Sequence, residues 1–207
     1  MFSPDDTPPV LSPELRHFAT PTPINDLEQV IDRLVDIRLQ THIGPTQMSK
    51  LIGNKGIILQ LFYTRCTGVC PGTTAMLKTV AKQLSSRIGK DIVVLSLSLD
   101  AERETQADLK EFAKRHRLPN GWYAAMCTKS DLTTLLRQLR LDVKPSKGSD
   151  GTIKHASQIV YGSNVSGRWR MINAELPKPE LIRDMVELTV DGLSYKQRSS
   201  GRNPTQK

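Results

Sequence analysis

Hydrophobic and polar positions along the chain follow two patterns, short apolar runs and longer stretches with apolar residues three or four apart. Two runs, at 57–63 and 92–99, are apolar almost throughout, which is typical of central strands covered on both faces. After the first run, residues 71–88 place apolar side chains on one helical face and open on Pro71, as helices often do. The pattern therefore predicts a strand, a loop and a helix in succession.

The same alternation continues to about residue 190. The further predicted elements are helices at 105–118 and 130–141, short strands at 34–39, 123–127, 157–161 and 168–172, and a closing helix containing Leu181, Ile182, Met185 and Val186. A turn is predicted at Gly44-Pro45 and a loop at 144–151. The last two strands are expected to form an antiparallel hairpin around residues 162–167.

Strands and helices in this order predict an α/β fold, a thioredoxin-like three-layer sandwich with a central mixed β-sheet flanked by helices. Residues 24–191 are expected to form this single domain. Residues 1–23 are rich in proline with little apolar periodicity and are predicted to be an extended leader. Residues 192–207 are predicted to be a disordered basic tail.

The candidate chemistry lies at the first junction between strand and helix. Cys66 and Cys70 stand there with three residues between them, and Pro71 follows directly. A helix start lowers the pKa of a thiol through its unpaired N–H groups and its dipole. Two cysteines four positions apart can aim both sulfurs at one point, so the pair predicts either disulfide exchange or soft metal ligation.

Composition and charge narrow the function only slightly. The chain has 207 residues and three cysteines, which excludes a network of structural disulfides. The third, Cys127, is expected to be a buried core residue. The net charge of +8 comes from basic residues scattered over solvent positions and the tail, so nucleic-acid binding is not expected.

Neither a spanning apolar run nor a secretory signal is visible, so any membrane anchor is expected to be missing from this chain.

If Cys66 and Cys70 bind a metal ion, one of the four histidines is the natural third ligand. His155 follows a glycine- and lysine-rich loop and precedes a strand, where loops converge over the strand ends of an α/β sheet. On placement alone it is the best candidate, although most histidines in such loops have no special role. The others, His17, His42 and His116, are expected to have none.

Taken together, several motifs resemble the Sco/SenC family of copper proteins over about residues 30–190. They are residues 63–71 around the cysteine pair, Ser98 to Thr105, residues 109–113, and His155 followed by a small residue and Ser157. The resemblance implies a thioredoxin-like fold and copper, as Cu(I) or Cu(II), held by Cys66, Cys70 and His155. It also implies that Asp100 lies near the site, either beside the ligands or as a contact for the partner.

The resemblance further implies a partner and a location. Such proteins deliver copper to, or reduce the cysteines of, the copper centre of cytochrome c oxidase, so we expect its copper subunit or another copper or thiol protein as partner. They work in the periplasm, at the outer face of the inner membrane or in the mitochondrial intermembrane space. A reduced pair is required for metal binding, because a disulfide offers no thiolate.

Two positions depart from the family pattern. The family often has a histidine just before the first cysteine and an acidic residue two before the second, where this chain has Arg65 and Gly68. A more positive site favours thiolate but disfavours a bound cation. The alternative is therefore a thiol-disulfide oxidoreductase or thiol peroxidase that uses Cys66 and Cys70 as a redox-active pair without a stable metal. A binding module without chemistry is a third class.

Overall fold

A computed structural model describes residues 29–30, 33–141, 146–147, 153–154, 158–173 and 189. Their helices are α1 (Met48–Ile52), α2 (Val69–Gln83), α3 (Gln106–His116) and α4 (Lys129–Gln138). The strands are β1 (Gln29–Val30), β2 (Arg38–Thr41), β3 (Gly44–Gln47), β4 (Gly56–Phe62), β5 (Ile92–Ser98), β6 (Trp122–Met126), β7 (Ser146–Lys147), β8 (Ile153–Lys154), β9 (Gln158–Ser163) and β10 (Arg168–Asn173).

The central feature is a mixed sheet. Its strand order in the described residues is β1-β10-β9-β4-β5-β6-β2-β3, and β7 pairs with β8 in a separate two-stranded ladder. Strands β4, β5 and β6 run parallel, while β9 joins β4, and β2 joins β6, in antiparallel fashion. Each residue of β4 and β5 is buried, as expected for strands covered on both faces.

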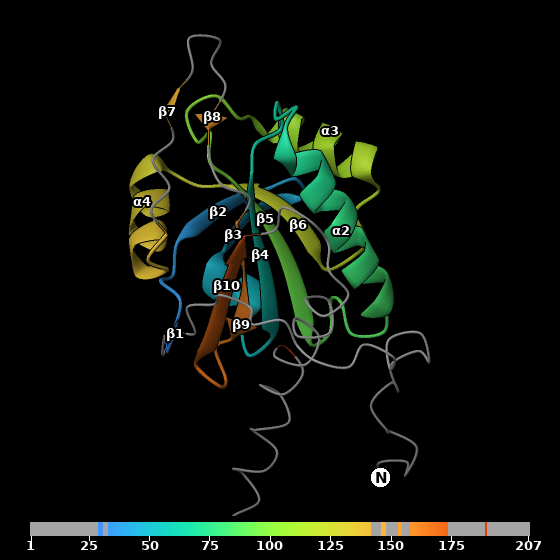
Figure 1. Ribbon diagram of the computed structural model, residues 1–207, viewed down its shortest axis with the longest axis vertical. Coiled ribbons are helices and arrows are strands. Elements are labelled where there is room, and N and C mark those ends of the chain that lie inside the picture. The colour runs from blue at the N-terminus through green and yellow to red at the C-terminus, as the bar shows by residue number, and fades with distance from the viewer. Residues whose placement is uncertain are drawn as a thin grey trace, which may run out of the picture.

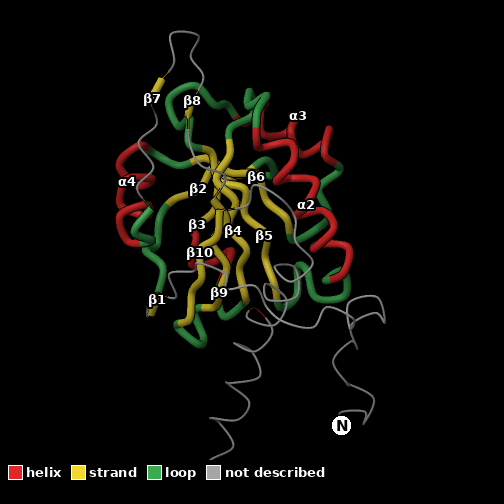
Figure 2. The backbone as a smooth tube through the Cα atoms, in the orientation of Figure 1, coloured by secondary structure: helices red, strands yellow, loops and turns green. Residues whose placement is uncertain are grey.

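Helices cover both faces of this sheet, as Figures 1 and 2 show. The two crossovers β4-α2-β5 and β5-α3-β6 progress in the same direction, so right-handed connections place α2 and α3 on one face. Phe62 on β4 packs against Phe112 of α3, with ring centroids 4.5 Å apart. Helix α4 lies on the other face, where its buried residues Leu132 and Leu135 join the larger hydrophobic cluster. The three-layer α/β prediction is confirmed.

A hydrogen-bonded chain of polar side chains crosses the core beneath α2. Trp122 Nε1 donates to Ser96 Oγ at 2.9 Å, Ser96 Oγ donates to Gln60 Oε1 at 3.0 Å, and Gln60 Nε2 donates to Thr74 Oγ1 at 3.0 Å. All of these residues are buried. These hydrogen bonds offset the desolvation cost of the buried side chains and connect β4, β5, β6 and α2.

The prediction for the first strand was wrong in its position. Residues 34–35 are not in a strand, because the backbone N–H of Val35 donates to Gln138 Oε1 of α4 at 2.8 Å. Strand β2 begins at Arg38, and the predicted turn residue Pro45 lies within β3 at the end of the described strand order. An edge strand tolerates proline because the missing N–H has no ladder partner there. The turn instead centres on residues 42–43, where Thr41 Oγ1 accepts two backbone N–H groups.

The other differences between the predicted and the observed elements are smaller. Part of the predicted loop 144–151 forms β7, and Gly162 and Ser163, expected in the hairpin turn, belong to β9. A side chain at position 162 would collide with the backbone of Arg168, so only glycine fits there. The predicted closing helix, the leader at 1–23 and the tail at 192–207 lie outside the described residues.

Candidate metal and thiol centre

The parallel strands β4 and β5 bring two loops together at their carboxyl ends. Phe62 is paired with Ser98, so both strands end at the same level of the sheet. The loop at 63–68 therefore leaves the sheet beside the loop at 99–105, at the edge where open α/β sheets place their binding sites. We call these the cysteine loop and the acidic loop.

The cysteine pair lies at the end of the cysteine loop. Cys66 is half-buried, Cys70 stands in the first turn of α2 and is buried, and both are free thiols. A hydrogen bond with the Cys66 side chain raises the pKa of Cys70 far above its ordinary range, and burial raises it further. Cys70 therefore keeps its proton and donates it to the sulfur of Cys66. The two sulfurs are neighbours, and Cys66 is the one that faces solvent.

Tyr63 connects this pair to a distant part of the chain. The residue is 4% exposed, and burial is the first cause that raises the pKa of Tyr63, followed by the charge of Cys66. A hydrogen bond with the backbone of Ile153 acts in the opposite direction. Ile153 begins β8, ninety residues further along the chain. Tyr63 thus holds β8 against the cysteine pair.

Glu104 of the acidic loop fixes the start of the cysteine loop. Its Oε1 accepts a hydrogen bond from the backbone N–H of Thr64 at 2.9 Å and another from Thr64 Oγ1 at 2.9 Å. The side chain is buried, and its Oε2 has no hydrogen-bond partner. Burial raises the pKa of Glu104, since removal from water disfavours the carboxylate.

Arg65 makes the next connection between the two loops. Its guanidinium donates to the backbone oxygen of Arg103 at 3.1 Å and lies 3.8 Å from Asp100 and 3.9 Å from Asp108. Asp100 is buried and accepts from Arg103 Nε at 2.8 and 3.0 Å, which raises the pKa of Arg103. The positive charge at position 65 is therefore balanced by carboxylates of the acidic loop and of α3. It does not act on the thiols alone.

Comparison with known proteins decides the family. The family model described as SCO1/SenC matches residues 36–189, about three quarters of the chain. The chain belongs to the SCO1/SenC family. A SCO1 protein homologue of Bacillus subtilis is 26% identical over 108 residues, a match that spans 51% of this chain and 55% of that relative. The chain thus covers about half the length of the curated relative it matches.

Solved structures agree on the fold of this Sco domain. A crystal structure of an Aquifex aeolicus VF5 protein assigned to electron transfer has a TM-score of 0.64 and 26% identity, covering 75% of this chain and 92% of the other. Arabidopsis thaliana ScoI with copper bound has a TM-score of 0.62 and 20% identity, covering 78% and 98%. At that identity the second likeness shows the fold alone.

The residues predicted for the site can now be placed in the Sco domain. Cys66 and Cys70 come together as expected, and Asp100 lies beside the cysteine loop, reached through Arg65. His155 lies outside the described residues, and within them no third histidine, cysteine or carboxylate joins the pair as a metal site. The ligand set of Cys66, Cys70 and His155 therefore stays a prediction.

Cys127, His42 and His116 have surroundings of their own in the Sco domain. Cys127 is buried in the core, and burial raises its pKa to about 12. His42 accepts from the backbone N–H of Ala124, and His116 stacks near Phe112, so both have structural surroundings. His17 lies outside the described residues. None of the helices in the described part is long and apolar enough to cross a membrane.

Tyr63 and Glu104 were missed as members of the site. Tyr63 ends the apolar run of the strand, so its pattern indicates only core packing. The position of Glu104 in the sequence could have indicated that it belongs to the site. It follows the second parallel strand by a few residues, and the carboxyl ends of neighbouring parallel strands meet at one edge.

Proposed function

We propose that this Sco protein takes up copper through Cys66, Cys70 and His155 and delivers it to the copper centre of cytochrome c oxidase, or reduces the cysteines of that centre. Copper is the cargo of this function. The contact between the Cys66 and Cys70 sulfurs is the observation that carries the proposal, because two adjacent thiols at a half-exposed loop match the preference of Cu(I) for soft ligands.

The third ligand is supported by the position of β8. The backbone of Ile153 is hydrogen-bonded to Tyr63, which is also hydrogen-bonded to Cys66, and His155 directly follows Lys154, the last residue of β8, in the sequence. Two residues of chain span at most about 7 Å, so the length of chain between Ile153 and His155 allows an imidazole at position 155 to reach the pair. An imidazole added to two thiolates gives a set that also suits Cu(II).

The protonation and exposure of the two cysteines set the order of steps in metal uptake. Cys70 retains its proton in the reduced pair, so metal binding releases a proton from it. Cys66 is more exposed than Cys70 and meets an incoming metal or partner first. Oxidation of the pair to a disulfide removes both thiolates, and the redox state of the pair thus gates metal loading.

Copper titration of the reduced protein tests this proposal. We expect one Cu(I) per chain in competition with a chromophoric chelator under anaerobic conditions, and one Cu(II) with a thiolate charge-transfer band. Cys66→Ala, Cys70→Ala and His155→Ala should each weaken binding at least about tenfold. Cys127→Ala, which removes a buried thiol that is not one of the proposed ligands, is the matched control. Binding that survives the first three changes contradicts the proposal.

A second candidate function is disulfide exchange with a partner protein. It is favoured by the unequal pair, since Cys66 is half-exposed and Cys70 is buried with a raised pKa, an arrangement suited to an attacking and a resolving cysteine. Absence of copper binding together with a defined midpoint potential supports this function instead. In both cases we propose action outside the cytoplasm, in the periplasm or an equivalent compartment, where Sco-type partners are exposed.

A further inference from the structure

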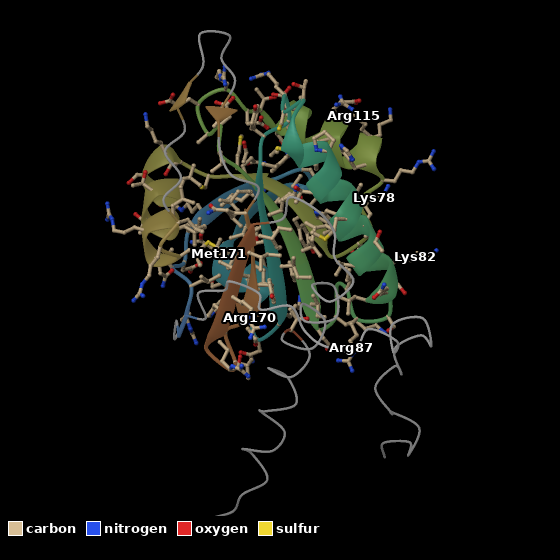
Figure 3. All side chains as sticks on the ribbon, in the orientation of Figure 1. Lys78, Lys82, Arg87, Arg115, Arg170 and Met171 are labelled. Atoms are coloured by element: carbon tan, nitrogen blue, oxygen red, sulfur yellow. The ribbon has the colours of Figure 1, made fainter. Side chains whose placement is uncertain are left out.

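Helix α2 carries the second cysteine and a line of exposed basic residues. Between residues 69 and 90 the sequence has Lys78, Lys82, Arg87 and Lys90 and no acidic residue. Lys78 and Lys82 are exposed and form no ion pair in the part of the chain that the structure describes. Figure 3 shows Arg115, Lys78, Lys82 and Arg87 one below another along one side of the molecule. We call these four residues the basic column.

Two lysines of the basic column share a stripe of α2 with exposed residues that follow Cys70 in the sequence. Pro71, Ala75, Lys78 and Lys82 are all exposed and recur at helical spacing, so they form a single stripe along α2. The side chains of the stripe are small and uncharged at Pro71 and Ala75, close to Cys70 in the sequence, and basic at Lys78 and Lys82. At 1.5 Å per residue, Lys78 and Lys82 lie about 12 and 18 Å along the axis from Cys70.

Charges on α3 add to the positive potential of the basic column. Arg115 and His116 end α3, which lies on the same face of the sheet as α2. The pKa of His116 is lowered by burial first and then by the positive charges of Lys78 and Arg115, so the seam between the two helices is electropositive. Arg87 and Arg115 have nearby acidic partners in Asp91 and Glu111, which leaves the two lysines as the uncompensated charges.

We propose that this face of α2 is the docking surface for an acidic protein, whose own thiol or copper site is thereby brought to Cys66. This inference rests on the proposed function and names the kind of partner. A protein interface of standard size covers about 800 Å² on each side, roughly 30 Å across, and so reaches both the thiols and the lysines. Complementary charge at the rim steers association and fixes orientation.

Two other anionic partners fit the surface less well. Insertion into a lipid surface needs exposed apolar side chains, and the one large hydrophobic residue exposed among those described, Ile43, lies in the turn between β2 and β3. Sequence-tolerant binding of single-stranded nucleic acid uses exposed aromatic platforms, and no aromatic side chain is exposed on the described part of this face. A protein partner needs neither feature.

The test uses the full reduced chain and two synthetic peptides with the same Cys-x-x-x-Cys disulfide, one flanked by glutamates and the other by lysines. The Cys66 thiolate attacks the peptide disulfide, and Cys70 then closes on Cys66. The protein pair loses two electrons and two protons, which the peptide gains as two thiols. We expect the acidic peptide to react at least about tenfold faster at low ionic strength, and the advantage to disappear in about 0.5 M salt.

A charge-reversal variant locates the effect. Lys78→Glu/Lys82→Glu should abolish or invert the preference for the acidic peptide. Lys50→Glu/Arg137→Glu, which makes the same change in net charge on α1 and α4, should retain it. Reduction of the small, uncharged hydroxyethyl disulfide should be equal in all three proteins, which shows that the thiols themselves are intact.

The outcomes separate this inference from the proposed function. If copper binds but the peptides react equally, the docking surface is wrong and the copper proposal stands. If copper fails to bind but the preference holds, the docking surface stands and serves disulfide exchange. Binding to vesicles of anionic phosphatidylglycerol, absent with phosphatidylcholine and lost in Lys78→Glu/Lys82→Glu, would assign the surface to lipid and overturn the inference.

Discussion

Glu104 holds Thr64 by two hydrogen bonds, both 2.9 Å long, one to the backbone N–H and one to the side-chain hydroxyl. The acceptor is a buried carboxyl oxygen, and Thr64 stands two residues before Cys66. Local sequence therefore does not determine the position of Cys66 alone, because a residue forty positions further along the chain anchors its loop.

Removal of this anchor should destabilise the fold. Glu104→Ala leaves the partly buried N–H and hydroxyl of Thr64 without an acceptor, which costs about 1–3 kcal/mol in the free energy of unfolding. Urea unfolding followed by circular dichroism measures the change. Glu111→Ala, an exposed carboxylate on α3, is the control and should change stability by less than about 0.5 kcal/mol. A loss no larger than that of the control contradicts the anchor.

The raised pKa of Glu104 predicts a dependence of stability on pH. Between the ordinary value of 4.5 and the raised folded value, the folded chain binds a proton that the unfolded chain does not. The contribution of Glu104 is thus fully present below 4.5 and is lost as pH rises through the folded pKa. Glu104→Gln lacks this titration. Its unfolding free energy relative to wild type should increase from pH 4.5 toward neutral pH, and a constant difference contradicts the assignment.

The order and type of most elements could be predicted because each element has its own hydrophobic pattern. Strands β4 and β5 begin or end within one residue of the apolar runs that predicted them, and α3 and α4 appear where the periodicity placed them. Helix α2 also forms there but ends at Gln83, five residues before its predicted end. Short edge elements have no such pattern. Strand β2 is displaced from its predicted place because the chain before it is hydrogen-bonded to Gln138, a tertiary contact.

The candidate site also has residues that could be predicted from the sequence and residues that could not. The cysteine pair could be predicted because a strand, a loop and a helix start are read from neighbouring residues. The roles of Tyr63, Glu104 and Arg65 could not, because each depends on a contact with a distant segment, at Ile153, Thr64 and Asp100 respectively. Spacing along the chain carries no information on such contacts without the register of β4 against β5.

Ser96 is expected to be the most sensitive polar residue in the core. Its hydroxyl accepts from Trp122 Nε1 and donates to Gln60 Oε1. Ser96→Ala removes both partners at once and leaves two buried polar groups unpaired, so the free energy of unfolding should fall by about 2–5 kcal/mol. Intrinsic fluorescence during urea unfolding measures this change. Ser85→Ala, at an exposed position after α2, should leave stability within about 0.5 kcal/mol of wild type.

Asp100 should contribute more to stability than the exposed ion pair between Lys129 and Glu102. It is buried and accepts two hydrogen bonds from Arg103, whereas Lys129 and Glu102 form a pair of comparable length at the surface. Asp100→Asn should lower the free energy of unfolding by about 2 kcal/mol, the usual size for hydrogen bonds to a charged group. Lys129→Ala should lower it by at most about 0.5 kcal/mol. Equal effects would show that Arg103 finds another partner or turns to solvent.

The three cysteines should differ in their rates of alkylation in the reduced, folded protein. Cys66 is half-buried, whereas Cys70 and Cys127 are 4% and 8% exposed and have raised pKa values. With a pKa of about 12, only about one Cys127 in ten thousand is a thiolate at pH 8, so its labelling should become at least about a thousandfold faster when the protein unfolds. Mass spectrometry after iodoacetamide pulses measures each site.

The Cys66→Ala variant separates the two causes of the slow reaction of Cys70. The hydrogen bond with Cys66 is the largest cause of the raised pKa of Cys70, and burial is the second. Without Cys66 the pKa of Cys70 should fall toward its ordinary value, and its alkylation at pH 8 should become at least about tenfold faster although its depth is unchanged. Cys127, whose pKa is raised by burial and by Asp131 rather than by the pair, should keep its wild-type rate in the same variant. An unchanged rate at Cys70 would mean that burial alone controls it and that the two sulfurs are not coupled in solution.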